Sequence, residues 1–279
     1  FKLNTDGTGF TVLQNFNYST TGAYPFGATL MQGADGALYG AATSGGTFGA
    51  GTAFKLNTDG TGFTVLQNFD YSTTGGHPYA GLVQGTDGAL YGTATQGGPS
   101  SYGTAFKLNT DGTGFAVLKS FDYSTAGGYL YAGLIQGIDG VLYGTAYQGG
   151  MNSVGTVFKL NTDGTGFSVL KSLSYGIDQG EGAYPFAGVT EGADGVLYGT
   201  TAQGGISFAG TVFKMNKDGT GFAVLKHFDF STTGAYLYGG LVQGTDGALY
   251  GAAYQGGAFG AGTLFKLNTD GTGFTVLKN

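Results

Sequence analysis

The sequence predicts an all-β fold, a β-propeller of four-stranded antiparallel blades, on the basis of three observations. The first is a motif, Phe-Lys-(Leu/Met)-Asn, that recurs at intervals of 52 to 55 residues, beginning at Phe1, Phe54, Phe106, Phe158, Phe213 and Phe265. The second is a pair of Asp-Gly turns in each interval, between short aromatic and β-branched segments, which is typical of β-hairpins. The third is composition, because Gly makes up 59 of 279 residues and no helical periodicity is present.

The repeats divide into units of roughly 52 residues, which we expect to form a single domain over residues 1–279. Their bounds are about 17–69, 70–121, 122–173, 174–228 and 229–279. In the second unit we expect strand a at 79–84, strand b at 89–95, strand c at 103–108 and strand d at 115–119. Four short strands in each repeat of this length are typical of propeller blades. The main alternative, a β-solenoid, needs parallel pairing between repeats, whereas Asp-Gly turns favour antiparallel pairing within one.

The number of blades depends on a spare half-unit. Strands c and d occur six times but strands a and b only five, because residues 1–16 supply an extra N-terminal c–d hairpin. Five blades are favoured and six are possible, the sixth being completed by another chain. A hairpin with exposed edges can pair with a second chain, so we expect dimers or filaments. Because the sequence starts inside a repeat, we also expect a processed product or an excerpt of a longer array.

Charge and composition exclude several classes of partner. The chain has 11 Lys, no Arg and a net charge of −6, so it lacks the basic surface of a nucleic-acid-binding protein. No apolar run approaches 18 residues, and no basic amphipathic helix is predicted, so we expect no membrane insertion in this segment. Cys is absent, which excludes disulfides and thiolate metal sites.

The polar residues predict no catalytic centre, no metal site and no cofactor, and therefore no enzyme. Eleven of the 15 Asp residues precede Gly, which indicates turns; the alternative is calcium binding by loops such as Asn109–Gly114. His77 and His227 occupy different repeat positions, which argues against zinc or a His-based triad. Asp178 and Glu181 lie in the one divergent loop and could serve as a glycosidase pair, but a solvated loop is the simpler interpretation.

Aromatic residues in the d–a and b–c loops are the candidate ligand-binding site. In an up-and-down blade these loops share one face, opposite the Asp-Gly turns, and Phe26 is among their further aromatic residues. Aromatic platforms beside neutral hydrogen-bonding groups suit sugars, although the rings could instead pack between blades. The predicted site residues are Tyr24, Tyr79, Tyr131, Tyr184, Tyr238, Gln96, Gln148, Gln203 and Gln255.

Two segments, Asp87–Gly98 and Tyr102–Asn109, resemble the GloVer (Gloeo/Verruco) tandem repeat of bacterial surface and secreted proteins. Because such segments recur in every unit, the resemblance covers essentially the whole chain. The resemblance implies an extracellular bacterial location and a propeller-like fold, and it carries over no activity. The Gly-Gly end of strand b also resembles a kelch blade, although the Trp of the kelch pattern is missing from strand d. We therefore predict a non-enzymatic extracellular structural or interaction module that self-associates through the spare hairpin. The alternative is a multivalent carbohydrate-binding lectin, and a glycan-active enzyme is third.

Overall fold

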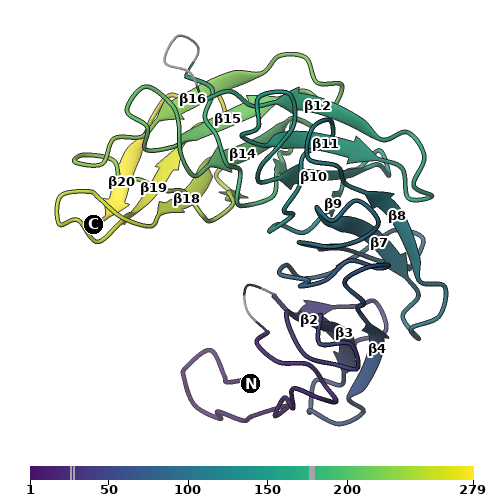
Figure 1. Cartoon of the computed structure of the whole chain (residues 1–279). Coiled ribbons are helices and arrows are strands. Elements are labelled where there is room, and N and C mark those ends of the chain that lie inside the picture. Colours follow the sequence, from purple (N-terminus) through teal and green to yellow (C-terminus); the bar gives the residue numbers. More distant parts are fainter. Residues whose placement is uncertain (26, 28, 176–179) are drawn as a thin grey trace. The chain divides into compact units, whose positions relative to one another are not determined.

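Twenty short strands form five separate four-stranded antiparallel sheets in the described part of a computed structural model of the chain (Figure 1). The structure describes residues 1–25, 27, 29–175 and 180–279, so Phe26 and Asp178 lie outside the described residues. In each sheet the strands follow one another as a meander. We name the sheets blades 1 to 5 and keep the letters a to d for the strands within each.

The strands of each blade are short and recur at equivalent repeat positions. Blades 1 and 2 contain β1 (Met31–Gln32), β2 (Leu38–Ala42), β3 (Thr52–Leu56), β4 (Thr64–Asn68), β5 (Val83–Gln84), β6 (Leu90–Ala94), β7 (Thr104–Leu108) and β8 (Ala116–Ser120). Blades 3 to 5 contain β9 (Ile135–Gln136), β10 (Leu142–Ala146), β11 (Thr156–Leu160), β12 (Ser168–Ser172), β13 (Thr190–Glu191), β14 (Leu197–Thr201), β15 (Thr211–Met215), β16 (Ala223–His227), β17 (Val242–Gln243), β18 (Leu249–Ala253), β19 (Thr263–Leu267) and β20 (Thr275–Lys278).

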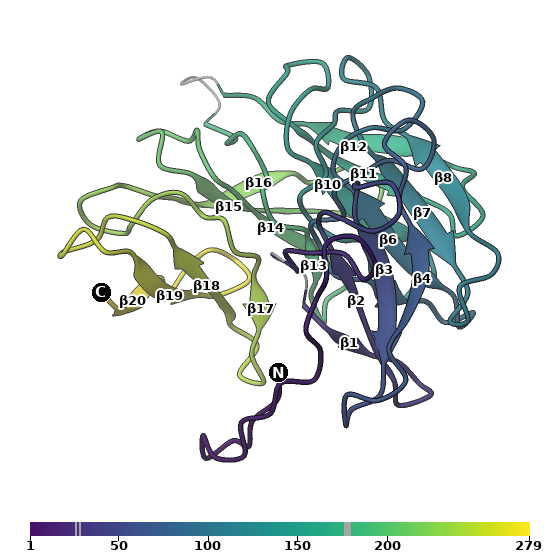
Figure 2. The ribbon, with the colours of Figure 1, turned by 60° about the horizontal axis from the view of Figure 1, so that its bottom comes forward.

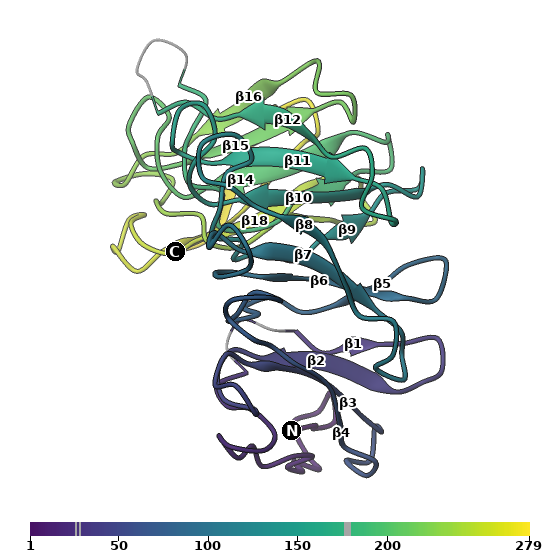
Figure 3. The same cartoon turned by 45° about the vertical axis from the view of Figure 1, so that its right-hand side comes forward.

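The chain divides into two compact units, and each is described by itself. Unit 1 spans Phe1–Phe121 and holds residues 1–16 with blades 1 and 2; unit 2 spans Asp122–Asn279 and holds blades 3 to 5. The meander of blade 1 can be followed in Figure 2 and that of blade 3, from β9 to β12, in Figure 3.

Asp side chains close the turns of each blade. In the a–b turn of blade 1, Asp35 Oδ1 accepts a hydrogen bond from the N–H of Ala37 (3.1 Å), and Asp35 Oδ2 accepts one from the Tyr39 hydroxyl (2.7 Å). In the c–d turn of blade 2, Asp111 Oδ1 accepts hydrogen bonds from the N–H and the hydroxyl of Thr113 (2.9 and 2.7 Å). These bonds hold the pKa of Asp111 below its usual value, and the bond from the Thr113 hydroxyl has the larger effect. The carboxylates therefore act as turn acceptors.

Strand a is much shorter than the sequence predicts. In blade 2 only Val83 and Gln84 pair with β6, whereas 79–84 was expected. The residues before strand a instead meet the preceding blade. In unit 2, for example, the hydroxyl of Thr145 in blade 3 donates to the Ala187 carbonyl ahead of β13, and that of Thr200 in blade 4 donates to the Gly239 carbonyl ahead of β17 (both 3.0 Å). The backbone polar groups of this segment bond between blades, so less of it remains for pairing within its own sheet.

A β-bulge in strand d directs a leucine toward the next blade. The pairing of strands c and d shifts register at the same repeat position in all five blades, and Leu66 is the extra residue in blade 1. Its carbonyl lies close to Gly112 in the c–d turn of blade 2. A Cβ on Gly112 would stand only 2.8 Å from the Leu66 oxygen, so the turn needs a glycine there. The bulge thus fixes how successive blades stack within a unit.

The core lies between successive blades rather than within any one sheet. In unit 1, Tyr39 and Ala53 of blade 1 share a buried cluster with Leu90 and Phe106 of blade 2. In unit 2, Tyr198 and Val212 of blade 4 share the equivalent cluster with Leu249 and Phe265 of blade 5. Each sheet therefore contributes apolar side chains on both faces, and a neighbouring blade has to cover each of them.

Candidate functional site

The predicted tyrosines occupy two different positions in the repeat. Tyr24 and Tyr184 have left-handed backbone, with φ of 53° and 59°, and their carbonyls accept hydrogen bonds from Thr43 and Ala202 (both 3.0 Å). The N–H of Tyr184 also donates to the carbonyl of Val154 in the preceding blade (2.7 Å). A left-handed backbone held by such hydrogen bonds indicates that this position has a structural role. Tyr79, Tyr131 and Tyr238 lie two residues further along their repeats.

Rings from all three blades of unit 2 form one connected aromatic network. Tyr131 stacks on Phe186 (ring centroids 4.8 Å apart, planes at 13°) and meets Tyr147 edge-on (5.2 Å). Tyr147 contacts Tyr184 (5.3 Å), and Phe186 contacts Tyr238 (5.2 Å). The network continues to Tyr254, 5.5 Å from Tyr238.

The network joins three predicted site residues, Tyr131, Tyr184 and Tyr238, to aromatic residues outside the predicted site, among them Tyr147, Phe186 and Tyr254. Phe186 is one of the d–a loop aromatic residues and has the same repeat position as Tyr131 and Tyr238. Burial raises the pKa values of Tyr131 and Tyr147, whereas Tyr238 and Tyr254 are 40% and 64% exposed. One end of the network is therefore packed and the other is open to a ligand. Tyr24 and Tyr79 lie in unit 1.

The predicted glutamines serve the fold through their backbone. The carbonyls of Gln96, Gln148, Gln203 and Gln255 accept hydrogen bonds of 2.7 to 2.8 Å from Gly76, Gly128, Ala183 and Ala235. These bonds tie the b–c loop to the d–a loop of the same blade. Gln255 is exposed and the other three residues are half-buried.

The predicted acid and histidine candidates have structural partners. The Glu181 carboxylate forms an ion pair with Lys171 (2.5 Å), and Asp178 lies outside the described residues. His227 Nδ1 accepts a hydrogen bond from the Ile206 N–H (3.4 Å), and burial, followed by the charge of Lys226, lowers the pKa of His227. Among the described residues, no three or more His, Asp or Glu side chains gather as metal ligands would.

Residues 1–16 pack on blade 1 as the outer half of a preceding blade would. Lys2 Nζ donates to the Thr58 carbonyl in the c–d turn of blade 1 (3.3 Å), as Lys214 does to Thr269 between blades 4 and 5 (3.4 Å). The Phe16 ring lies 5.1 Å from Phe54, which matches the 4.8 Å between Phe228 and Phe265.

Two further contacts complete the match. The Leu13 carbonyl lies 2.7 Å from where a Cβ on Gly60 would stand, as the Leu66 carbonyl lies 2.8 Å from the equivalent point on Gly112. Lys2 and Thr11 form an antiparallel bridge with two backbone hydrogen bonds of 2.9 Å. We call residues 1–16 the half-blade, because strands a and b have no counterpart in it.

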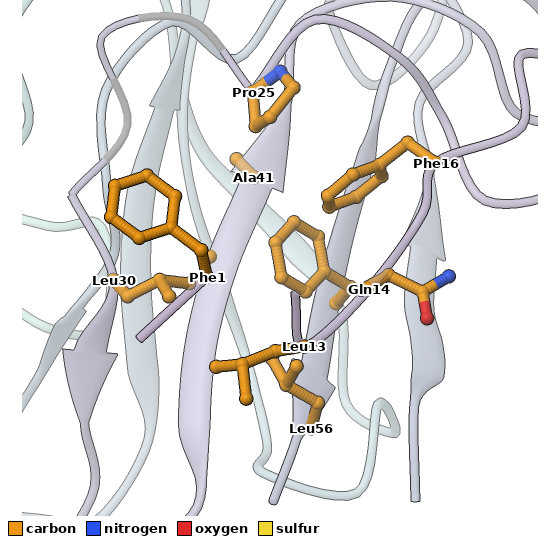
Figure 4. A pocket seen from close by; sticks show the side chains of 10 residues that line it. Phe1, Leu13, Gln14, Phe16, Pro25, Leu30, Ala41 and Leu56 are labelled. Atoms are coloured by element: carbon orange, nitrogen blue, oxygen red, sulfur yellow. The ribbon is translucent and has the colours of Figure 1, made fainter. Parts of the chain in front are cut away.

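A pocket of about 390 Å³ lies where the inner strands of such a preceding blade would stand. Its apolar walls come from the half-blade and from blade 1, and Figure 4 shows Phe1, Leu13 and Leu30 among them. Leu30 is 44% exposed, whereas its equivalents Leu82 and Leu241 are 6% and 3% exposed. The face of blade 1 is therefore only half covered.

Blade 5 leaves the opposite kind of face exposed. Leu264 and Val242 are 53% and 67% exposed, whereas Val212, the equivalent of Leu264 in blade 4, is fully buried. Tyr250, which corresponds to the buried Tyr39 and Tyr198, is half-exposed. Blade 5 thus presents the surface with which each earlier blade of a unit covers the next one.

Comparisons with known proteins agree with this repeat architecture. A family model described as the Gloeobacter/Verrucomicrobia repeat matches residues 1–150 and 125–279. No curated protein matches the sequence. No helix in the described ranges has the length and apolar character needed to cross a membrane.

Three solved structures are similar in fold. They are a nidogen/laminin complex (TM-score 0.55, 16% identity, 86% of this chain and 74% of that one), the Niastella koreensis GH74 enzyme (0.60, 15%, 90% and 38%) and the putative TolB of Agrobacterium tumefaciens (0.51, 11%, 93% and 79%). All three are propeller proteins. Together with the five sheets, they confirm the predicted all-β propeller fold with five four-stranded blades; at these identities they show the fold alone. The likeness to kelch blades stays a prediction.

Proposed function

Because the chain belongs to the Gloeobacter/Verrucomicrobia repeat family, we propose that it is a non-enzymatic, extracellular interaction module that associates with further copies of itself. The observation that carries the proposal is the half-blade, which covers only the outer part of the blade 1 face and leaves an apolar pocket beside it. Blade 5 presents the complementary surface. One copy therefore offers what another copy lacks.

Such an association is head-to-tail. The two surfaces differ, so each copy uses one to bind the copy ahead and the other to bind the copy behind. Apolar patches rimmed by polar residues commonly mark interaction surfaces. The assembly is expected to grow with protein concentration into short filaments or to close into rings.

Sedimentation velocity of the full chain over a concentration series tests this function. The wild type should form oligomers, and Leu30→Asp should weaken association at least tenfold, because it places a charge in the pocket. Ile138→Asp is the matched control, since Ile138 is also an exposed apolar residue (93%) but lies in an a–b turn. A wild-type chain that stays monomeric at every concentration would refute self-association.

The aromatic network favours a second candidate function, binding of neutral glycans. Tyr238 and Tyr254 offer exposed rings beside Gln255, and stacked aromatic surface with amide groups suits the apolar faces and hydroxyls of sugars. A glycan array should then give signals that Tyr254→Ala removes without changing the melting temperature. The absence of binding to every glycan leaves self-association as the function.

A further inference from the structure

We propose that copies of the chain join by hairpin exchange, in which strands β17 and β18 of one copy pair with the half-blade of another. This rests on the proposed self-association and names the segment that enters the pocket. The product is a composite blade, with strands a and b from one chain and strands c and d from the next. The released segment is residues 263–279.

The two competing c–d segments have the same sequence. Residues 1–13 and 265–277 both read Phe-Lys-Leu-Asn-Thr-Asp-Gly-Thr-Gly-Phe-Thr-Val-Leu. In blade 5, β18 pairs with β19 in the register Leu249↔Leu267, Tyr250↔Lys266 and Gly251↔Phe265. The exchange replaces these three pairs by Leu249↔Leu3, Tyr250↔Lys2 and Gly251↔Phe1, with identical side chains, and gives up the other two pairs, Ala252↔Leu264 and Ala253↔Thr263.

The contacts of the released segment are also largely reproduced. Phe265 and Leu267 belong to the buried cluster between blades 4 and 5, and Phe1 and Leu3 carry the same side chains. Asn279 accepts a hydrogen bond from the Ala258 N–H (2.8 Å), a role open to Asn15. Within residues 1–16, Thr263 and Leu264 have no counterpart, and Gln14 stands at the position of Lys278. Leu264 is already 53% exposed, whereas the exchange breaks the hydrogen bond from the buried Thr263 hydroxyl to the Thr233 carbonyl (2.7 Å).

The exchange adds one interface that the separate chains lack. In blades 1 and 4, Tyr39 and Tyr198 point from strand b into the cluster shared with the next blade. Tyr250 is their equivalent and would enter the pocket beside Leu30 of the second copy. Replacing one segment by another of the same sequence changes the free energy little. The burial of Tyr250 against the second copy is therefore what drives assembly.

A disulfide that locks β18 to β19 tests the exchange. Ala252 and Leu264 are opposite each other in that pair, so oxidised Ala252→Cys/Leu264→Cys holds 263–279 in place. The matched control is Ala41→Cys/Ala53→Cys, the same repeat positions in blade 1, where a lock leaves β18 free. Each protein is refolded from urea at high and low concentration and sized by light scattering under oxidising and reducing conditions.

The exchange predicts that the oxidised blade 5 lock is monomeric, with at least a tenfold loss of oligomer, and that reductant restores assembly. The blade 1 lock should assemble like the wild type in both conditions. If the oxidised blade 5 lock assembles as well as the wild type, the exchange is wrong while self-association stands. If the wild type never assembles, both are wrong.

Discussion

The same face of the repeat is buried in blade 5 and partly exposed in blade 1. In blade 5, Leu241 and Leu249 are buried because blade 4 covers them with Tyr198 and Val212. In blade 1, the equivalent Leu30 is 44% exposed and borders a pocket, because the half-blade supplies strands c and d without strand b. The residues are the same at both places, so the neighbouring repeat, rather than the local sequence, decides their burial.

This comparison separates intrinsic from nearest-neighbour stability. In repeat architectures, stability is approximately a sum of terms for each unit and terms for each interface. At the junction of blades 4 and 5 the whole interface contributes to stability, whereas at the junction of the half-blade and blade 1 only part of that interface is present. Substitutions at matched positions in the two junctions therefore measure what strand b of the preceding blade contributes.

The largest expected difference is between Phe265→Ala and Phe1→Ala. Phe265 is fully buried, so its truncation should lower the free energy of unfolding by about 3–5 kcal/mol. Phe1 has the same repeat position but is 71% exposed, so its truncation should cost less than about 0.5 kcal/mol. Urea unfolding monitored by circular dichroism measures both. Equal losses would show that the half-blade is as firmly packed as a complete blade.

Alkaline titration should distinguish Tyr39 from Tyr250. Burial, followed by the hydrogen bond to Asp35, raises the pKa of Tyr39 to about 12, above the value of about 10 in an unfolded chain. Because the folded pKa is raised, the stabilisation is fully present below about pH 10 and is lost as the pH rises toward 12.

The half-exposed Tyr250 has a pKa raised chiefly by its hydrogen bond to Asp246, and it should ionise at lower pH than Tyr39. Phenolate absorbance of Tyr39→Phe and Tyr250→Phe against the wild type assigns each step. If Tyr39 ionised at a lower pH than Tyr250, the result would contradict the difference in burial between the two residues.

A third test compares an ionic junction with a neutral one. Glu191 of blade 4 accepts a hydrogen bond from the Ile138 N–H (3.0 Å) and pairs with Lys217. At the equivalent position in blade 5, neutral Gln243 accepts one from Ala193 (2.8 Å). We expect a coupling of roughly 1 kcal/mol in the cycle of Glu191→Gln and Lys217→Thr, with the double variant close to wild type. Additive losses in urea unfolding would mean that the two charges act independently.

The smallest effect concerns acid pH. His227 accepts a loop hydrogen bond only as neutral imidazole, and its folded pKa is lowered. Its stabilisation is therefore present above the unfolded pKa of about 6.5 and is lost as the pH falls through the folded pKa. His227→Asn introduces the residue found at Asn68 and Asn279, where the side-chain oxygen accepts the same bond. Its melting temperature should fall less than that of the wild type between pH 7 and 5.

The sequence predicts the blades well because their information is local. Asp-Gly turns, the repeat length and apolar residues on both strand faces define each meander without reference to its neighbours. Strand a was predicted too long because its first residues bond to the preceding blade, as Ala187 does to Thr145. Which loop aromatics meet was not readable from the repeat alone, because Tyr24 and Tyr184 have left-handed backbone, and the network that contains Tyr184 also includes Phe186 and Tyr254.

By itself, the sequence determined the all-β architecture, the five four-stranded units and the spare c–d segment, because turn chemistry and strand patterning act over a few residues. Only the tertiary structure decided which copies of an identical residue are buried. Phe1 and Phe265 begin identical 13-residue segments, yet Phe1 is exposed and Phe265 lies in a core. The physical reason is that a blade face is completed by side chains of the neighbouring repeat, and residues 1–16 cover only part of the blade 1 face.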